Sequence, residues 1–97
     1  MAAYVILMNL TDQGIKDIKD APERTAEAVK AIEAAGGKLL CFYVTMGAYD
    51  YVAIAEGPGD EVAMAQLLAL GMGGNVRTTT MRAFNQEDLR NILAMLP

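Results

Sequence analysis

The sequence predicts a single α+β domain in which four strands form one antiparallel sheet and two helices cover one of its faces. Apolar, β-rich segments and helical segments follow one another in the order β-α-β-β-α-β, and a further helix ends the chain. Glycine and proline separate these segments. The chain has 97 residues, which is the size of one small domain, so residues 1–97 are expected to fold as one unit.

The first strand is predicted over residues 3–9, where both alternating sets of side chains are apolar. A strand that is apolar on both faces is usually covered on both faces. A short turn of helix is expected over residues 11–15, with Ile15 and Ile18 pointing toward the core.

The main helix of the first half is predicted to begin near Asp20. Asp20 and Glu23 have the spacing of a capping box, and Pro22 is tolerated in the first turn, where its missing N–H has no partner to lose. Alanine, valine and isoleucine side chains then form a narrow apolar stripe. Gly36 and Gly37 are expected to end this helix, since a glycine readily adopts the left-handed conformation there.

A hairpin is predicted to join the second and third strands. Residues 38–46 form the second strand, which is again apolar on both sides. Gly47 and Ala48 are expected to form a two-residue type II′ turn, because its first central position requires a positive φ. Tyr49 and Asp50 would then stand at the head of the third strand, which runs to Glu56.

The second half repeats the layout of the first without an evident sequence repeat. A Gly-Pro-Gly break precedes a helix over residues 62–71, and a strand follows over residues 75–84. Asn85 is expected to cap the last helix. Apolar residues repeat in this helix at helical spacing: Leu89, Ile92, Leu93 and Leu96.

This order of elements is the split βαβ, or ferredoxin-like, pattern. Two helices can cover only one face of the sheet, yet the strands are apolar on both faces, and 54% of the residues are apolar. We therefore expect the uncovered face to meet the sheet of a second copy, which would form a homo-oligomeric, dimeric α/β barrel.

Composition excludes several classes of function. The net charge of −4 and the scattered basic residues argue against nucleic-acid binding, and no apolar stretch is long enough for a bilayer span. The chain has no histidine and one cysteine, Cys41, so no metal site, disulfide or cofactor is expected. No signal peptide is evident, and a cytoplasmic location is expected.

The candidate ligand-binding residues are Tyr49, Asp50, Tyr51, Arg77 and Thr79. A carboxylate between two tyrosines suits a polar ligand, and arginine suits a carboxylate. The structural alternative is that Asp50 accepts hydrogen bonds from free backbone N–H groups of the hairpin while the tyrosines pack at an interface. For the arginine and the threonine, the alternatives are an exposed or intersubunit ion pair and an ordinary β-branched strand position.

Four segments resemble the GYD domain family of small bacterial proteins, which is named for a Gly-Tyr-Asp signature. They are residues 10–14 (Leu-Thr-Asp-Gln-Gly), 46–50 (Met-Gly-Ala-Tyr-Asp), 70–80, where Leu-Gly is followed by Gly-Asn-Val-Arg-Thr-Thr-Thr, and 82–84 (Arg-Ala-Phe). Ala48 stands between the glycine and the tyrosine, so the signature here is Gly-x-Tyr-Asp. The resemblance implies a ferredoxin-like fold and supplies no reaction.

A weaker resemblance connects residues 45–51 and 76–80 with the effector-binding domain of leucine-responsive, feast/famine regulators. Those domains share the fold, pair their sheets and bind amino acids between dimers. The resemblance implies a stand-alone amino-acid-sensing domain as one function of this chain.

The sequence thus favours a homo-oligomeric binding or assembly module that takes a small polar metabolite near residues 47–50. The alternative is a cofactor-free monooxygenase or isomerase of the dimeric-barrel type, which would use Asp50 as its base and would need to enclose it in a pocket. A binding role is favoured over an enzymatic one, because no catalytic set of residues is evident.

Overall fold

The computed structural model describes residues 1–97, and its elements follow the predicted order. The strands are β1 (Ala2–Leu10), β2 (Lys38–Val44), β3 (Tyr51–Gly57) and β4 (Val76–Ala83). The helices are α1 (Asp12–Lys16), a 3-10 turn (Ile18–Asp20), α2 (Ala21–Ala34), α3 (Asp60–Met72) and α4 (Gln86–Leu93).

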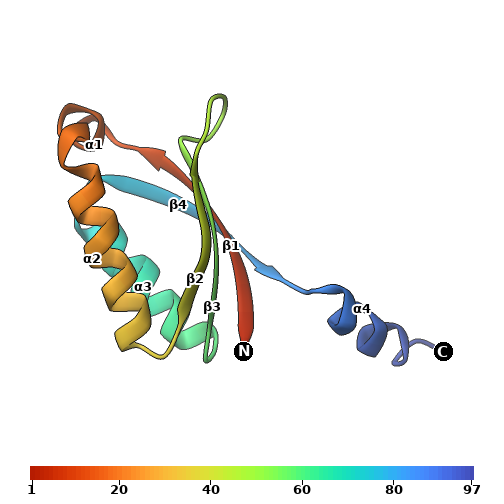
Figure 1. Ribbon diagram of the computed structural model, residues 1–97. Helices are drawn as coiled ribbons and strands as arrows, with labels where there is room; N and C mark the ends of the chain where they lie inside the picture. The colour runs from red at the N-terminus through yellow and green to blue at the C-terminus, as the bar shows by residue number, and fades with distance from the viewer.

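The four strands form one antiparallel sheet in the order β2-β3-β1-β4. Both α2 and α3 lie on one side of this sheet, and no element of the chain lies flat against the other side (Figure 1). This arrangement confirms the predicted α+β, ferredoxin-like fold.

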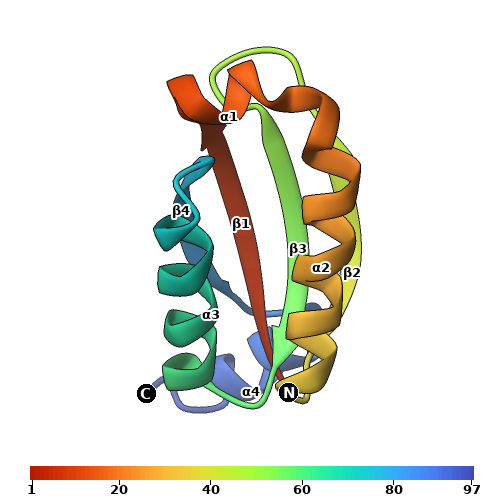
Figure 2. The same ribbon diagram turned by 90° about the vertical axis from the view of Figure 1, so that its left-hand side faces the viewer.

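The core lies between the sheet and the two helices, and it is thin. Seven residues are buried, and the six apolar ones all come from the sheet: Tyr4, Met8, Tyr51, Ala53, Ala55 and Val76. No large side chain is fully enclosed, because each helix covers only its own half of the sheet. Figure 2 shows α2 in front of β2, α3 in front of β4, and β1 and β3 visible between the helices.

The predicted two-residue hairpin is wrong in its length. Gly47 has the expected positive φ, +116°, but the connection spans residues 45–50, and β3 begins only at Tyr51. The reason is that the backbone N–H of Thr45 donates to the carbonyl of Asp50 at 2.8 Å, which closes a wider loop. Tyr49 and Asp50 therefore belong to the loop rather than to the strand.

The start of α2 also differs from the prediction. Asp20 makes no side-chain capping bond, because the 3-10 turn runs directly into the helix and leaves Asp20 with near-helical angles, φ −90° and ψ 0°. An N-cap side chain needs an extended backbone in order to fold over the first turn. Ile15 is 54% exposed and does not join the core. Gly36, with φ +86°, ends the helix as expected.

The last helix, α4, has the expected cap at Asn85, where a full capping box with Asp88 is formed. It ends at Leu93, so the fourth residue of the predicted apolar repeat, Leu96, lies beyond it. In both views α4 lies past the end of β4, on the side of the sheet away from α2 and α3 (Figures 1 and 2). None of the helices combines the length and the apolar character that a bilayer span requires.

Candidate functional site

The loop over residues 45–50 is held together by its own polar groups. The Thr45 hydroxyl donates to the Tyr49 carbonyl at 2.6 Å, while the Thr45 backbone pairs with Asp50. Between these bonds, Met46 is fully exposed and Gly47 adopts its positive φ. The loop is thus an ordered projection at one end of the sheet (Figure 1).

Asp50 connects this loop to the central strand β1. Its backbone N–H donates to the Met8 carbonyl at 2.9 Å, and its carboxylate accepts the Leu10 N–H at 2.8 Å. The side chain therefore satisfies a backbone donor at the point where β1 leaves the sheet, which is the structural role weighed above for this carboxylate. Asp50 is half-buried, and it does not line the space between the sheet and the two helices.

The five candidate residues do not converge on one point. Tyr51 is buried on the helix-covered side, where its ring lies 5.2 Å from the ring of Phe42. Thr79 pairs with Leu7 and lies on the opposite face. Arg77 pairs with Asn9 from the edge strand β4, and its guanidinium reaches back to Gly71 of α3. A small ligand cannot contact both faces at once, and a binding role for each of these residues stays a prediction.

A second polar cluster lies at the same end of the molecule as the loop, and it was not anticipated from the sequence. The Thr11 hydroxyl donates to the Gly74 carbonyl at 2.5 Å, and the Gln13 amide donates to the Asn75 side chain at 3.0 Å. Gly14 is buried against Asn75, and a Cβ at position 14 would lie 2.0 Å from the backbone carbonyl oxygen of Asn75. Three of the four segments that carry the family resemblance thus meet at this end of the sheet.

A third cluster lies at the opposite end, at the start of α3. The Tyr4 hydroxyl donates to Asp60 Oδ1 at 2.5 Å, and Arg82 Nε lies 3.5 Å from the same oxygen. The Arg82 guanidinium also stands 4.8 Å from the centre of the Phe84 ring. The hydrogen bond to the Asp60 carboxylate, together with burial, raises the pKa of Tyr4 above its usual value of 10. The raised pKa chiefly reflects the loss of this hydrogen bond when the Tyr4 hydroxyl gives up its proton.

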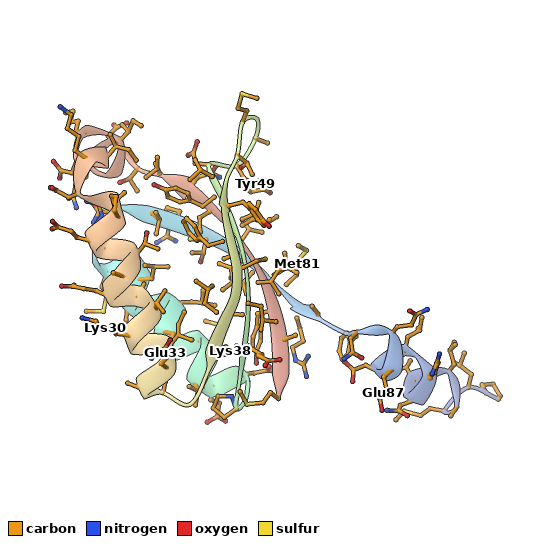
Figure 3. All side chains as sticks on the ribbon, viewed as in Figure 1. Lys30, Glu33, Lys38, Tyr49, Met81 and Glu87 are labelled. Carbon is orange, nitrogen blue, oxygen red and sulfur yellow. The ribbon has the colours of Figure 1, made fainter.

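The most extensive unpartnered feature is the side of the sheet away from α2 and α3, here called the open face. Residues that pair directly across antiparallel strands point to the same side, so the strand register identifies its members. They are Val5, Leu7, Cys41, Tyr43, Val52, Ile54, Thr79 and Met81. Tyr43 is 65% exposed and Met81 is 48% exposed, and Figure 3 shows Met81 projecting away from the helices.

The helix α4 presents a second unpartnered apolar surface. Its exposed apolar side chains are Leu89, Ile92 and Leu93, and Met95 and Leu96 follow beyond its end. Only Phe84 and Asn85 connect α4 to β4, and this short extended link directs the helix away from its own domain (Figure 1). An isolated helix of eight residues is marginally stable in water, so α4 needs an apolar partner surface.

Comparison with known proteins agrees with this architecture. The sequence matches the GYD domain over residues 4–93. It is also 30% identical over 90 residues to a protein of Thermus thermophilus named glutamine synthetase and cystathionine beta-lyase binding protein. The alignment covers 92% of this chain and 95% of that protein.

No group of side chains in the structure has the composition of a metal site.

Proposed function

The chain belongs to the GYD domain family, and we propose that it is a protein-binding module that works as a pair of identical subunits. The observation that supports the proposal is the open face, whose central side chains are all apolar except Thr79 and which no element of the chain covers. Contiguous exposed apolar surface of this kind marks interaction sites in soluble domains.

A second copy is the partner that fits the open face best. Two twisted sheets pack face to face about 10 Å apart, with side chains from both inner faces interdigitating. A twofold axis through the open face would place each apolar residue against the same patch of the partner. The polar residues Asn9 and Glu56 lie near the ends of their strands, where they would form part of the rim.

The position of α4 supports the same assembly. It lies on the side of the sheet that the second copy would occupy (Figures 1 and 2). We propose that α4 of each subunit packs against the other subunit, which would cover both its apolar stripe and part of the partner's surface. The interface would then include the contacts of both α4 helices and would be larger than the contact between the two sheets alone.

Sedimentation velocity tests the pairing. The wild-type protein should sediment as a dimer, and Ile54→Lys, in the middle of the open face, should sediment as a monomer because a buried unpaired charge is costly. Ala34→Lys, which places the same charge at an exposed position of α2, should remain a dimer. A monomeric wild-type protein would refute the proposed pairing.

The name of the Thermus relative supports enzymes as the further partners. That protein is named for binding glutamine synthetase and cystathionine beta-lyase, and we propose that this chain binds enzymes of these two kinds. Biolayer interferometry with the immobilised chain and each purified enzyme from the same source organism tests this. Saturable binding to either enzyme, and none to an unrelated oligomeric enzyme, is expected. Absence of binding to both would overturn the enzyme-partner proposal and leave the pairing unaffected.

A further inference from the structure

The space between the sheet and its two helices contains a cavity of about 420 Å³. Its floor is the helix-covered side of β1 and β3, and its walls are α2 and α3. The lining is mostly apolar, and it includes Ile6 and Met8 on the floor, Ile32 on α2 and Leu70 on α3. Figure 2 looks toward β1 and β3 between the two helices, which is the direction of this cavity.

The cavity follows from the amino-acid sequence. In the middle of β3, the two residues that face the helices are Ala53 and Ala55, and α2 and α3 contribute further alanines, among them Ala28 and Ala63. Small side chains on both sides of a sheet–helix interface leave the space between them unfilled, whereas protein interiors are normally close-packed. The volume exceeds the roughly 150 Å³ of an engineered apolar cavity that binds benzene, and it falls within the roughly 300–1,000 Å³ of ligand pockets.

One buried side-chain oxygen in the cavity wall lacks a partner. Thr80 lines the cavity from β4, opposite Ile6, and its hydroxyl oxygen makes no hydrogen bond. This oxygen has almost no exposed surface, so the Thr80 side chain must rotate before a ligand can reach it. Tyr4 also lines the cavity, but its hydroxyl donates to Asp60. A buried hydroxyl without a partner carries a free-energy cost that a ligand oxygen would remove.

We propose that this cavity binds a small, neutral, mainly hydrocarbon molecule that carries one hydroxyl or carbonyl oxygen, and that this oxygen pairs with the Thr80 hydroxyl once the Thr80 side chain has rotated toward the cavity. The apolar lining selects the hydrocarbon part, and the buried, unpaired Thr80 hydroxyl selects the oxygen. The inference is independent of the proposed protein partners and concerns the face of the sheet away from the open face.

The volume of the cavity suits a ligand of modest size. It lies at the lower end of the range of ligand pockets, and a molecule of the size of naphthol or octanol fits.

Methyl NMR with 2-naphthol and, separately, naphthalene as probes tests the proposal on the full chain. Binding should shift the methyl signals of Ile6, Ile32 and Leu70, and it should leave those of Val5 and Val52 on the open face unchanged. Shifts confined to the open face would overturn the proposal, because the probes would then be binding exposed sheet. Shifts of the α4 methyl groups instead would equally overturn it.

Two pairs of variants complete the test. Ala55→Leu should occupy part of the cavity and weaken 2-naphthol binding, whereas Ile54→Leu on the open face should leave binding unchanged. Thr80→Val should weaken 2-naphthol binding about five- to tenfold, which is the contribution of one hydrogen bond. It should leave the affinity for naphthalene unchanged. Thr79→Val, next to it on the open face, should change neither. If Ala55→Leu leaves 2-naphthol binding unchanged, or if Thr80→Val weakens the binding of both probes equally, the cavity does not bind the proposed ligand.

Discussion

At the scale of single residues, Asp50 shows how a signature residue can serve the fold. Its backbone and its side chain both bond to β1, at Met8 and Leu10. The pairing of β1 with β3 ends at Met8 and Tyr51, so the Asp50 carboxylate, rather than a strand carbonyl, accepts the Leu10 N–H. These bonds hold the loop over residues 45–50 against β1.

Removing that carboxylate should destabilise the protein. Asp50→Ala leaves the Leu10 N–H without its acceptor and should cost about 1–3 kcal/mol, whereas Asp50→Asn keeps an acceptor oxygen and should cost less. Urea unfolding of the two variants measures both values. An Asp50→Ala protein as stable as the wild type would show that the carboxylate is available for another role.

Gly14 permits the close approach of α1 to the α3–β4 connection. Gly14→Ala would place a Cβ 2.0 Å from the Asn75 carbonyl oxygen, so the backbone must shift, and we expect a loss of about 2 kcal/mol or more. Gly57→Ala is the matched control, because a Cβ there meets nothing within 4 Å. Urea unfolding should separate the two variants clearly, and equal stabilities would contradict the packing described.

The Tyr4–Asp60 hydrogen bond gives the protein a dependence on alkaline pH. The pKa of Tyr4 is raised in the folded state, so its stabilising contribution is complete below pH 10 and is lost as the pH rises through the folded-state pKa. In an ultraviolet titration of the folded protein, one of the four tyrosines should ionise later than an unperturbed tyrosine. Tyr4→Phe should remove this late phase, and Tyr43→Phe, at an exposed position, should retain it.

At the scale of elements, the order of strands and helices was predictable because each has its own periodicity and its own end signals. Asn85 with Asp88 fixed the start of α4, and Gly36 fixed the end of α2, since both act through bonds or angles within a few residues. The length of the hairpin was not predictable, because Asp50 bonds to β1, forty residues away. Strand pairing over a similar distance along the chain also places Tyr51 and Thr79 on opposite faces of the sheet, which the local sequence pattern does not reveal.

The contribution of α4 to assembly can be measured directly. Leu93→Gln should weaken the dimer, because it places a polar group on the apolar stripe that is proposed to contact the second subunit. Glu87→Gln, on the same helix, should leave the dimer unchanged. Sedimentation equilibrium gives both dissociation constants, and an unaffected Leu93→Gln dimer would place α4 outside the interface.

At the scale of the whole molecule, the domain divides into a covered and an uncovered half. The covered half is thinly packed, with seven buried residues and a cavity, and the uncovered half is an apolar sheet. A chain of this size hides only about 60–65% of its unfolded surface, so its own core contributes modestly to stability. The second copy is therefore expected to supply a large part of the free energy of folding.

This dependence on a second copy predicts a melting temperature that rises with protein concentration, because association favours the folded state by mass action. Scanning calorimetry over a hundredfold range of concentration should show the rise for the wild type and for Ala34→Lys. Ile54→Lys, which cannot pair, should melt at a lower temperature that is independent of concentration. Each subunit carries a net charge of −4, so added salt should also strengthen pairing by screening the repulsion between subunits. A wild-type melting temperature that is independent of concentration would mean that the single chain is stable with its open face in water.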